Sequence, residues 1–448
     1  MVIGNPPYGA TLDIIQKQFI QDNYQSFEYQ INTYVIFYEL GLNLLRHGGI
    51  LGYITPATFA YGHYFKNIRE IFGNYNQLFI SKYFYDVFDD ADIGDTVTWV
   101  IQKSENKKSD IFIQLCHNSE SAMREPSLTS YVDVVNDDLT YNLNKSPLNI
   151  KKFEGGCSEL GSISNIIVGI KPYQSGKGKP AQTAQVVKDK IFTTFGIQLN
   201  DEYIQCVIGK DFHRYKFLNE PTMFIKYGEW LAEPRFTAPF FDDEKIIIRQ
   251  TADSLICNID DLKRVNLNNV YNIGKTNDNF NLKYLLCILN SKFMNIIYQS
   301  LSQEKGKLFA EVKKVYLEKL PIKEIPLSEQ QPFIEKADLM LSLNKELQET
   351  INKFLRTLNR RFDLSDFSKN LQNWHLLDYK AFIKELAKKK IKLSLGDEAT
   401  WEDYFIAEQQ KAIALQNQIH KTDNEINQMV YELYGLSDDE IAMIEGAV

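Results

Sequence analysis

Two adjacent prolines directly after a short apolar run are the feature that most constrains the start of this chain. Val2-Ile3-Gly4 is typical of a strand, and Asn5-Pro6-Pro7-Tyr8 follows it at once. Proline has no backbone N–H and holds the residue before it in an extended conformation, so we expect the strand to end here. The side-chain oxygen of Asn5 and the carbonyl oxygen of Pro6 are then two acceptors on one side, with no competing donor.

Two acceptors of this kind suit a planar NH2 group. The lone pair of such an amine is delocalised into its ring, and acceptors that bind its hydrogens make the nitrogen a better nucleophile. Tyr8 can stack on a base swung out of a duplex, a contact worth about 1–3 kcal/mol. That stacking offsets an extrusion cost of a few kcal/mol. A proline-rich turn without chemical function is the alternative for these four residues.

The motif, the helical pattern at 34–40 and the segment at 48–56 resemble the N6-adenine DNA methyltransferases of restriction-modification systems. The match is to their TaqI-like and Type IIG branch. It implies an α/β fold, the C-terminal part of a class I S-adenosylmethionine-dependent (Rossmann-like) methyltransferase sheet. It also implies S-adenosylmethionine as methyl donor and Asn5, Pro6, Pro7 and Tyr8 as the catalytic residues that hold a flipped adenine.

The segment at 85–103 resembles the late strand region of the same family, where an aromatic residue lies on the other face of the flipped base. Phe88 is the candidate, with Tyr85 behind it. A core aromatic is the alternative for each of the two residues.

The cofactor-binding part of this family normally precedes the motif and carries an acidic, glycine-rich turn, which this sequence lacks. We therefore expect a portion of a longer protein, without the first strands of the sheet and with most of the S-adenosylmethionine site outside it. An open sheet edge would be an association hazard. A nuclease part, which Type IIG enzymes generally carry upstream, would also lie outside this chain.

The global composition is that of a large cytoplasmic protein without a membrane span or signal peptide. Its five cysteines lie about 30 or more residues apart and are expected to be reduced and structural. None follows a proline, which argues against cytosine C5 methylation. Neither the cysteines nor the six histidines show metal-ligand spacing, so we expect no metal.

The charge is uneven along the chain, although the net charge of −8 is acidic. Residues 151–325 contain 25 lysines and arginines against 20 aspartates and glutamates, a net charge of +5, which leaves −13 for the rest. A basic middle part between acidic ends is compatible with one part that faces DNA.

The sequence predicts three domains: a partial catalytic domain at 1–150, a target-recognition domain at 151–325 and a helical region at 326–448. The middle part has short β-type runs between glycines and polar turns, typical of a mixed α+β domain. It resembles the target-recognition domain of the same family, and this resemblance rests on the segments 169–180, 226–236, 244–256, 284–293 and 304–322.

Several basic residues of this middle part suit contacts with double-stranded DNA. Lysines on glycine loops can reach phosphates, and arginines can make two-pronged contacts with guanine. The predicted phosphate contacts are Lys177, Lys179, Lys305 and Lys307, and the predicted base contacts are Arg235 and Arg249. A solvated surface charge is the alternative for each lysine.

Three further features of this part have structural interpretations. Tyr227 and Trp230 are expected to brace a loop or lie in the core rather than contact bases. Asp242-Asp243-Glu244 is expected to form a turn entering a strand rather than a nuclease-type metal site.

The C-terminal region predicts two long helices. Apolar residues recur at steps of three and four from Met340 to Leu358, and a second stripe runs from Phe405 to Leu433. We expect an antiparallel pair joined by a small region from Asp363 to Thr400 that includes Trp374. Arg356, Arg360 and Arg361 are interpreted as a solvated face, with phosphate binding as the alternative. The segment 426–445 again resembles Type IIG proteins.

The resemblance therefore implies a sequence-specific adenine methyltransferase that acts on double-stranded DNA. One alternative is a truncated, non-catalytic DNA-binding specificity module. A further alternative is a glutamine or RNA methyltransferase, since Asn-Pro-Pro-Tyr also suits amide NH2 groups.

Overall fold

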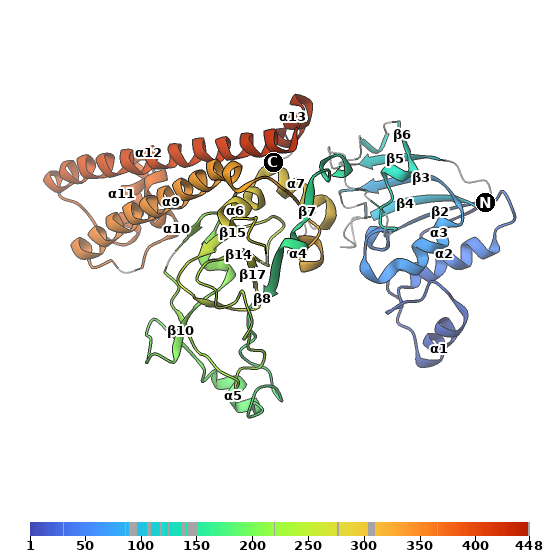
Figure 1. Ribbon diagram of the computed structural model, residues 1–448, viewed down its shortest axis with the longest axis horizontal. Coiled ribbons are helices and arrows are strands. Elements are labelled where there is room, and N and C mark those ends of the chain that lie inside the picture. Colours follow the sequence, from blue (N-terminus) through green and yellow to red (C-terminus); the bar gives the residue numbers. More distant parts are fainter. Residues whose placement is uncertain are drawn as a thin grey trace. The chain divides into compact units, whose positions relative to one another are not determined.

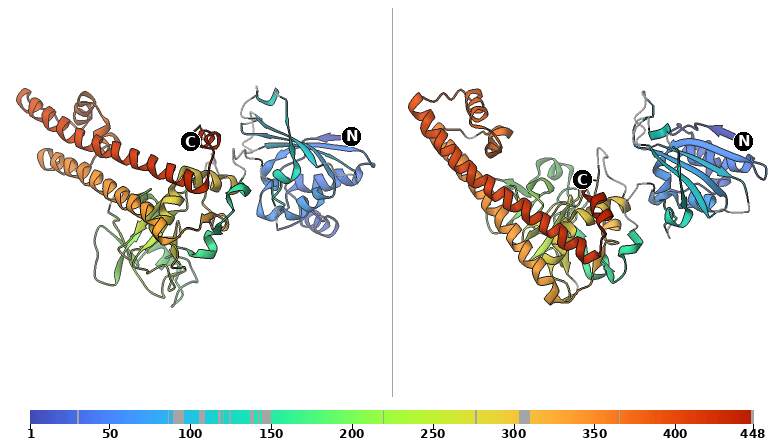
Figure 2. Two further views of the ribbon diagram at one scale, coloured as in Figure 1. Left: turned by 45° about the horizontal axis from the view of Figure 1, so that its top comes forward. Right: turned by 90° about the horizontal axis from the view of Figure 1, so that it is seen from above.

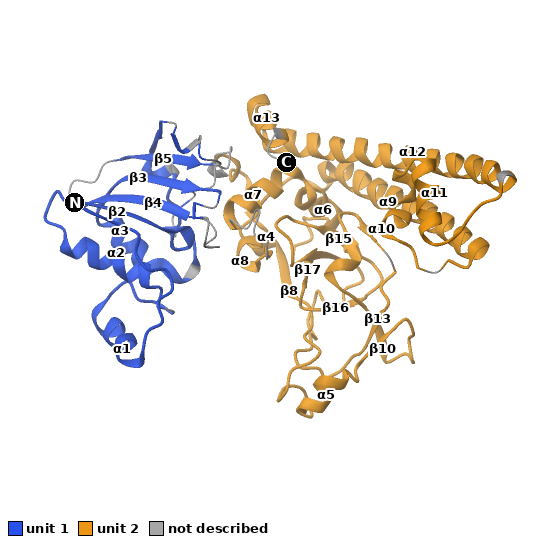
Figure 3. Cartoon of the chain, turned by 180° about the vertical axis from the view of Figure 1, so that it is seen from behind, with its two compact units in different colours: residues 1–149 blue, residues 150–448 orange. Residues whose placement is uncertain are grey.

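The computed structural model forms two compact units, residues 1–149 and 150–448 (Figure 3). Each unit has its own sheets and its own buried core. No helix among the described residues is both long and apolar enough to cross a membrane. The structure describes residues 1–29, 31–85, 87–88, 96–104, 109–116, 119, 121–123, 125–136, 139–141, 143, 150–218, 220–275, 277–302, 310–364 and 366–446.

A six-stranded mixed sheet forms the centre of the first unit, in the order β1-β2-β4-β3-β5-β6 (Figure 1). Its strands are β1 (Val2–Gly4), β2 (Ile50–Pro56), β3 (Asn76–Tyr83), β4 (Thr96–Gln102), β5 (Asp110–Cys116) and β6 (Ser127–Ser130). β1 runs parallel to β2 and β3 parallel to β5, whereas β4 lies antiparallel between β2 and β3. β1 is the outermost strand on its side of the described sheet, so its outer edge has no strand partner there.

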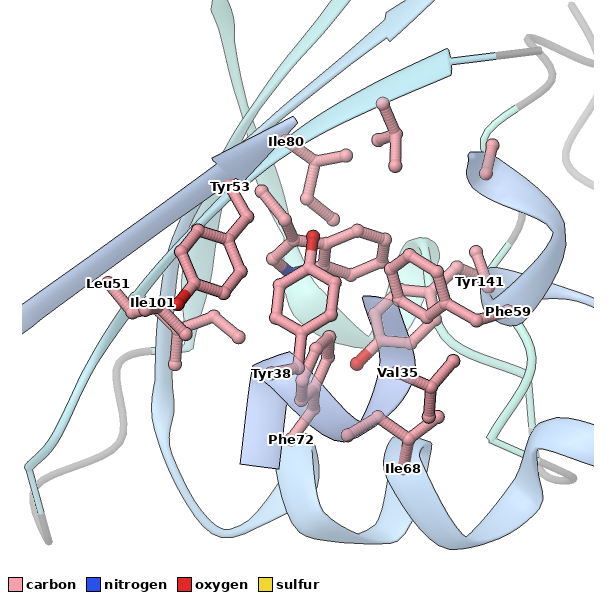
Figure 4. Packing of buried hydrophobic residues seen from close by; sticks show 14 of the residues in the cluster. Val35, Tyr38, Leu51, Tyr53, Phe59, Ile68, Phe72, Ile80, Ile101 and Tyr141 are labelled. Carbon is pink, nitrogen blue, oxygen red and sulfur yellow. The ribbon is translucent and has the colours of Figure 1, made fainter. Parts of the chain in front are cut away.

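Aromatic side chains fill the core between this sheet and its helices. Tyr38 is fully buried, with its ring centroid 5.0 Å from that of Phe72 and 5.2 Å from that of Tyr53 (Figure 4). Large buried aromatic rings dominate the energetics of such cores. The helical elements of the unit are α1 (Ile14–Asn23), α2 (Thr33–Leu44), η1 (Ala57–Ala60), η2 (His63–Phe65), α3 (Lys66–Gly73), η3 (Ser121–Met123) and η4 (Tyr131–Asp133).

Two four-stranded sheets form the β part of the second unit, in the orders β16-β10-β13-β9 and β15-β14-β17-β8. Two short pairs, β11-β12 and β18-β7, accompany them. The strands are β7 (Cys157–Glu159), β8 (Ser164–Val168), β9 (Thr193–Phe195), β10 (Tyr203–Val207), β11 (Phe212–His213), β12 (Lys216–Phe217), β13 (Met223–Lys226), β14 (Lys245–Arg249), β15 (Cys257–Asp260), β16 (Val265–Asn266), β17 (Val270–Lys275) and β18 (Pro321–Lys323).

The helices of the second unit include two of 36 and 40 residues. The helical elements are η5 (Ile150–Phe153), α4 (Leu160–Ile163), α5 (Ala184–Asp189), η6 (Gly209–Asp211), α6 (Leu282–Asn290), α7 (Lys292–Ser302), α8 (Lys314–Leu317), α9 (Leu327–Phe362), α10 (Lys369–Gln372), η7 (Trp374–Leu376), α11 (Tyr379–Lys388), α12 (Leu395–Tyr434) and α13 (Asp438–Gly446). The chain is thus a mixed α/β protein, as the sequence predicts.

The long helices α9 and α12 lie side by side in all three views (Figure 2). Lys336 pairs with Glu425 at 2.6 Å near one end, and Arg361 pairs with Asp397 at 3.3 Å near the other. Residue numbers rise along one helix as they fall along the other, so the pair is antiparallel, as predicted. The predicted stripe from Met340 to Leu358 is buried.

The segment between the two helices is shorter than the predicted 363–400, because α12 begins at Leu395. The Ser394 hydroxyl accepts the backbone N–H of Asp397 at 3.2 Å and caps the helix. Asp397 and Glu398 in the first turn favour this start, since carboxylates stabilise a helix N-terminus. Trp374 lies within the segment and stacks on Phe354, with 3.8 Å between ring centroids.

Candidate active site and nucleic-acid interface

The Asn5-Pro6-Pro7-Tyr8 motif follows the carboxyl end of β1. The parallel register with β2 places Gly4 beside Tyr53, so the motif begins next to the last residues of that strand. Ligands of open α/β sheets bind outside this edge. The Asn5 side chain is exposed there and Pro6 is buried, so the amide is accessible to a ligand.

The Tyr8 hydroxyl lies between two acceptors. It donates a hydrogen bond to Oδ1 of Asn5 and lies 3.2 Å from the carbonyl oxygen of Ile54. Partial burial raises the pKa of Tyr8, so its hydroxyl keeps its proton at neutral pH. Since a hydroxyl has a single proton, donation to Ile54 would leave Oδ1 of Asn5 as an acceptor for a ligand.

The turn after the motif is fixed by a residue of α2. Thr33 donates its hydroxyl proton to the carbonyl oxygen of Pro7 at 2.6 Å. The ring of the next residue, Tyr34, lies edge-on to that of Tyr8, with 6.2 Å between centroids. No described residue donates to the carbonyl oxygen of Pro6, although the residue itself is buried.

Phe88 and Tyr85 are both partly buried, and residues 86 and 89–95 between and after them lie outside the described part. Tyr85 packs edge-on against Tyr83, with 5.9 Å between ring centroids. The stacking role of Phe88 stays a prediction.

Lys177 and Lys179 lie on a loop whose shape is fixed by its own backbone. Gly178 has a φ of 87°, and a Cβ atom there would lie 2.4 Å from the carbonyl oxygen of Trp230. Only glycine fits such a position. Lys177 is exposed, and Lys179 is 80% exposed and 3.6 Å from Glu229. Both ammonium groups are therefore accessible from solvent.

Gln182 holds this lysine loop from inside. Its side chain is buried, and Nε2 donates to the carbonyl oxygens of Pro172 and Trp230, each at 2.8 Å. Its Oε1 accepts the N–H of Gln174 at 3.0 Å. The conformation of the loop is thus held by hydrogen bonds from a buried side chain.

The Arg235 guanidinium is bonded within the protein. Its Nε donates to the carbonyl oxygen of Val168 at 3.1 Å, and one terminal nitrogen lies 3.3 Å from Oε2 of Glu233. These bonds use only part of the five N–H donors of the guanidinium, so the base contact of Arg235 stays a prediction. In this structure Arg235 braces its own loop.

Arg249 ends β14 and is half-buried. Its Nε atom is buried, and no described residue bonds it. Because this donor does not face solvent, the structure leaves the base contact of Arg249 a prediction.

Two aromatic residues brace the neighbouring loop, as predicted. The hydroxyl of Tyr227 accepts the N–H of Arg235 at 2.8 Å and donates to its carbonyl oxygen. Trp230 donates its indole N–H to the carbonyl of Lys226 at 3.0 Å. Residues 242–244 lie in the turn before β14, as predicted.

Lys305 and Lys307 lie outside the described residues. Within the described part, no three His, Cys, Asp or Glu side chains gather as metal ligands. Sequence reasoning missed the two anchoring residues, Thr33 and Gln182. Both act through side-chain bonds to backbone atoms up to 48 residues away, for which a sequence carries no local signal.

Comparison with known families separates the chain into three matched segments. Residues 1–88 match the model of the Eco57I restriction-modification methylase, and residues 204–322 match the TaqI-like C-terminal specificity domain. Residues 326–430, which contain all of α9 and most of α12, match a domain of unknown function (DUF8810).

A protein of Methanocaldococcus jannaschii, named as a candidate type II restriction enzyme and methyltransferase, is 22% identical over 373 residues. The match covers 79% of this chain and 29% of that protein, so the chain spans less than a third of its curated relative. The structure of the Type IIL restriction-modification enzyme MmeI in complex with DNA aligns with 99% of this chain and 55% of that one. The TM-score is 0.53 at 11% identity, which shows a shared fold.

The predicted family resemblance is confirmed at the level of domains: this chain carries an Eco57I-type restriction-modification methylase segment followed by a TaqI-like C-terminal specificity domain.

Proposed function

We propose that this chain is the target-binding part of a site-specific DNA methyltransferase that methylates N6 of adenine. The observation that carries the proposal is the exposed Asn5 side chain at the end of β1, whose Oδ1 accepts a hydrogen bond from Tyr8. The carbonyl oxygen of Pro6 is the proposed second acceptor. A specificity domain on the same chain supports DNA rather than protein as the substrate. S-adenosylmethionine is the proposed methyl donor, and the cytoplasm is the proposed location.

The motif acts on the adenine amine by accepting its two hydrogens. Asn5 and Pro6 would hold the NH2 group with its nitrogen lone pair turned out of the ring plane. Tyr8 would lie against the base and, by donating to Ile54, leave Asn5 free to accept. The amine proton can leave to solvent after transfer, so no strong general base is needed among these residues.

The residues of this chain fit the amine better than they fit the cofactor. The two segments at the site, 1–9 and 50–60, contain no carboxylate that would bind the hydroxyl groups of a ribose. The cofactor would therefore be held mainly by other residues, as the family resemblance implies.

Duplex recognition is assigned to the second unit. The loop of Lys177 and Lys179 presents two accessible cations on a rigid backbone, which suits phosphate contacts that position a protein on DNA. Such contacts carry no sequence information. Base contacts must come from other side chains of the specificity domain.

Selection of bound duplexes from a randomised pool at fixed salt tests the proposal, using this chain with and without S-adenosylmethionine. We expect enrichment of a short motif that contains an adenine. Enrichment of a motif without adenine would overturn the adenine assignment. Failure to bind any duplex would overturn the DNA assignment and favour a methyltransferase for glutamine or RNA.

A further inference from the structure

A groove on α9 is lined by cations and amides. Lys353, Arg356 and Arg360 line it together with two amides and two apolar residues, Asn352, Asn359, Leu355 and Phe367. The three cations are exposed. None of the described residues that line the groove is acidic. The groove therefore offers hydrogen-bond donors and positive charge to any ligand.

The charge of the groove differs from that of its surroundings. Residues 326–448 contain 15 lysines and arginines against 21 aspartates and glutamates. Two other cations of α9 are paired, Lys336 with Glu425 and Arg361 with Asp397. In the described part of the chain, no carboxylate pairs with any of the three groove cations. Their charge is thus available to an anionic ligand.

The spacing of the three cations suits a polyanion. Residues 353 and 360 lie about 10 Å apart along a helix that rises 1.5 Å per residue. That length spans about three phosphates of a DNA strand, which follow at 3.4 Å per base pair along the axis. Arginine suits phosphate because its planar guanidinium donates two parallel hydrogen bonds.

The base of α9 is attached to the specificity domain. Asp338 pairs with Lys283 at 2.8 Å, and Gln330 accepts the N–H of Asn281 at 2.9 Å. Arg356 lies 18 residues beyond Asp338, a distance of about 27 Å along the helix, or about eight base pairs of duplex. The helix therefore holds the groove at a fixed distance from the domain that reads DNA.

We propose that this α9 groove binds the phosphate backbone of the same duplex, outside the recognition site. This inference rests on the proposed DNA-binding function and gives residues 326–430, a region of unknown function, a role in that binding. The groove would add affinity without adding sequence preference, because phosphate contacts are the same for every sequence.

The test compares Lys353→Ala/Arg356→Ala/Arg360→Ala with a control that removes three exposed lysines elsewhere in the region, Lys380→Ala/Lys384→Ala/Lys392→Ala. The dissociation constant is measured across a salt series for a long duplex and for one that only covers the selected motif. We expect the groove variant to lower the slope of log affinity against log salt by about 2–3 on the long duplex. On the short duplex the groove variant should have the same salt slope as the wild type. The control variant should have the wild-type slope on both duplexes.

Conservative replacement separates charge from shape. Arg356→Lys/Arg360→Lys keeps the cations and should retain most of the salt slope. If the triple alanine variant binds like the wild type with an unchanged salt slope, the groove inference is overturned and the proposed DNA-binding function still stands. An equal loss on both duplexes would overturn its placement outside the recognition site. Absence of duplex binding by the wild-type chain would overturn the proposed function, and the groove inference with it.

Discussion

The hydroxyl of Thr33 donates a hydrogen bond of 2.6 Å to the carbonyl oxygen of Pro7, across 26 positions of the sequence. The two prolines of the motif have no N–H groups, so the turn cannot be held by its own backbone donors. A donor from the first residue of α2 takes their place. Thr33 is thus a positioning residue for the acceptors of the motif.

Replacing Thr33 by valine is expected to lower methylation by a full-length parent enzyme about fivefold to tenfold, the equivalent of about 1 kcal/mol for one hydrogen bond. Valine keeps the shape of threonine and removes the donor. Thr33→Ser, which keeps the hydroxyl, should recover most of the rate. Hydrogen exchange of the motif turn should rise in the valine variant only, and equal rates for valine and wild type would refute the positioning role.

Replacing Asn5 by alanine in a full-length parent is expected to abolish methylation while leaving duplex affinity nearly unchanged. The change removes the proposed side-chain acceptor of the amine, whereas the residues proposed to bind the duplex lie in the second unit. Radioactive methyl transfer and duplex titration on the same preparation measure the two effects. Retained turnover would remove Asn5 from the proposed site.

The features that could be predicted from the sequence are those set by a periodic pattern of residues or by the covalent structure of proline. The period of the apolar stripe from Met340 to Leu358 predicted α9, and the prolines at 6 and 7 predicted where β1 ends. The sequence did not predict the internal bonds of Arg235, because an arginine free to contact guanine and one bonded to Val168 look the same in a sequence. The start of α12 was missed because Ser394 was not recognised as its cap.

Removing Lys177 and Lys179 together should weaken binding to all duplex sequences and reduce the salt slope by about 2, since two phosphate contacts are lost. Sequence preference should not change. A control that removes Lys345 and Lys369, two exposed lysines of the helical region, should keep the wild-type slope. If the variant without Lys177 and Lys179 has the same salt slope as the control variant, the two loop lysines do not contact DNA.

Trp374→Ala should destabilise the helical region by about 3–5 kcal/mol, the usual cost of removing a large buried aromatic side chain. Trp374 is fully buried, and its ring stacks on Phe354 and lies 5.6 Å from that of Phe405. Thermal unfolding followed by circular dichroism measures the loss. Leu376→Ala is a matched control, because Leu376 is 61% exposed in the same short turn. Equal stability of the two variants would contradict the packing.

Acid should weaken the link between α10 and α11 through Glu385. This buried carboxylate accepts hydrogen bonds from Ser368 at 2.8 Å and Asn370 at 3.0 Å, and it pairs with Lys388. The hydrogen bonds to Lys388, Asn370 and Ser368 lower the pKa of Glu385 to about 2 from its usual value near 4.5.

A carboxyl group with a lowered pKa in the folded state stabilises the fold fully above its unfolded pKa. That contribution is lost as the pH falls from about 4.5 towards 2. Glu385→Gln keeps the shape and removes the titration, so its unfolding midpoint should be lower at neutral pH and depend less on pH in this window. Glu349→Gln, at an exposed position of α9, should follow the wild-type curve. Parallel curves for all three proteins would show that Glu385 does not link folding to pH.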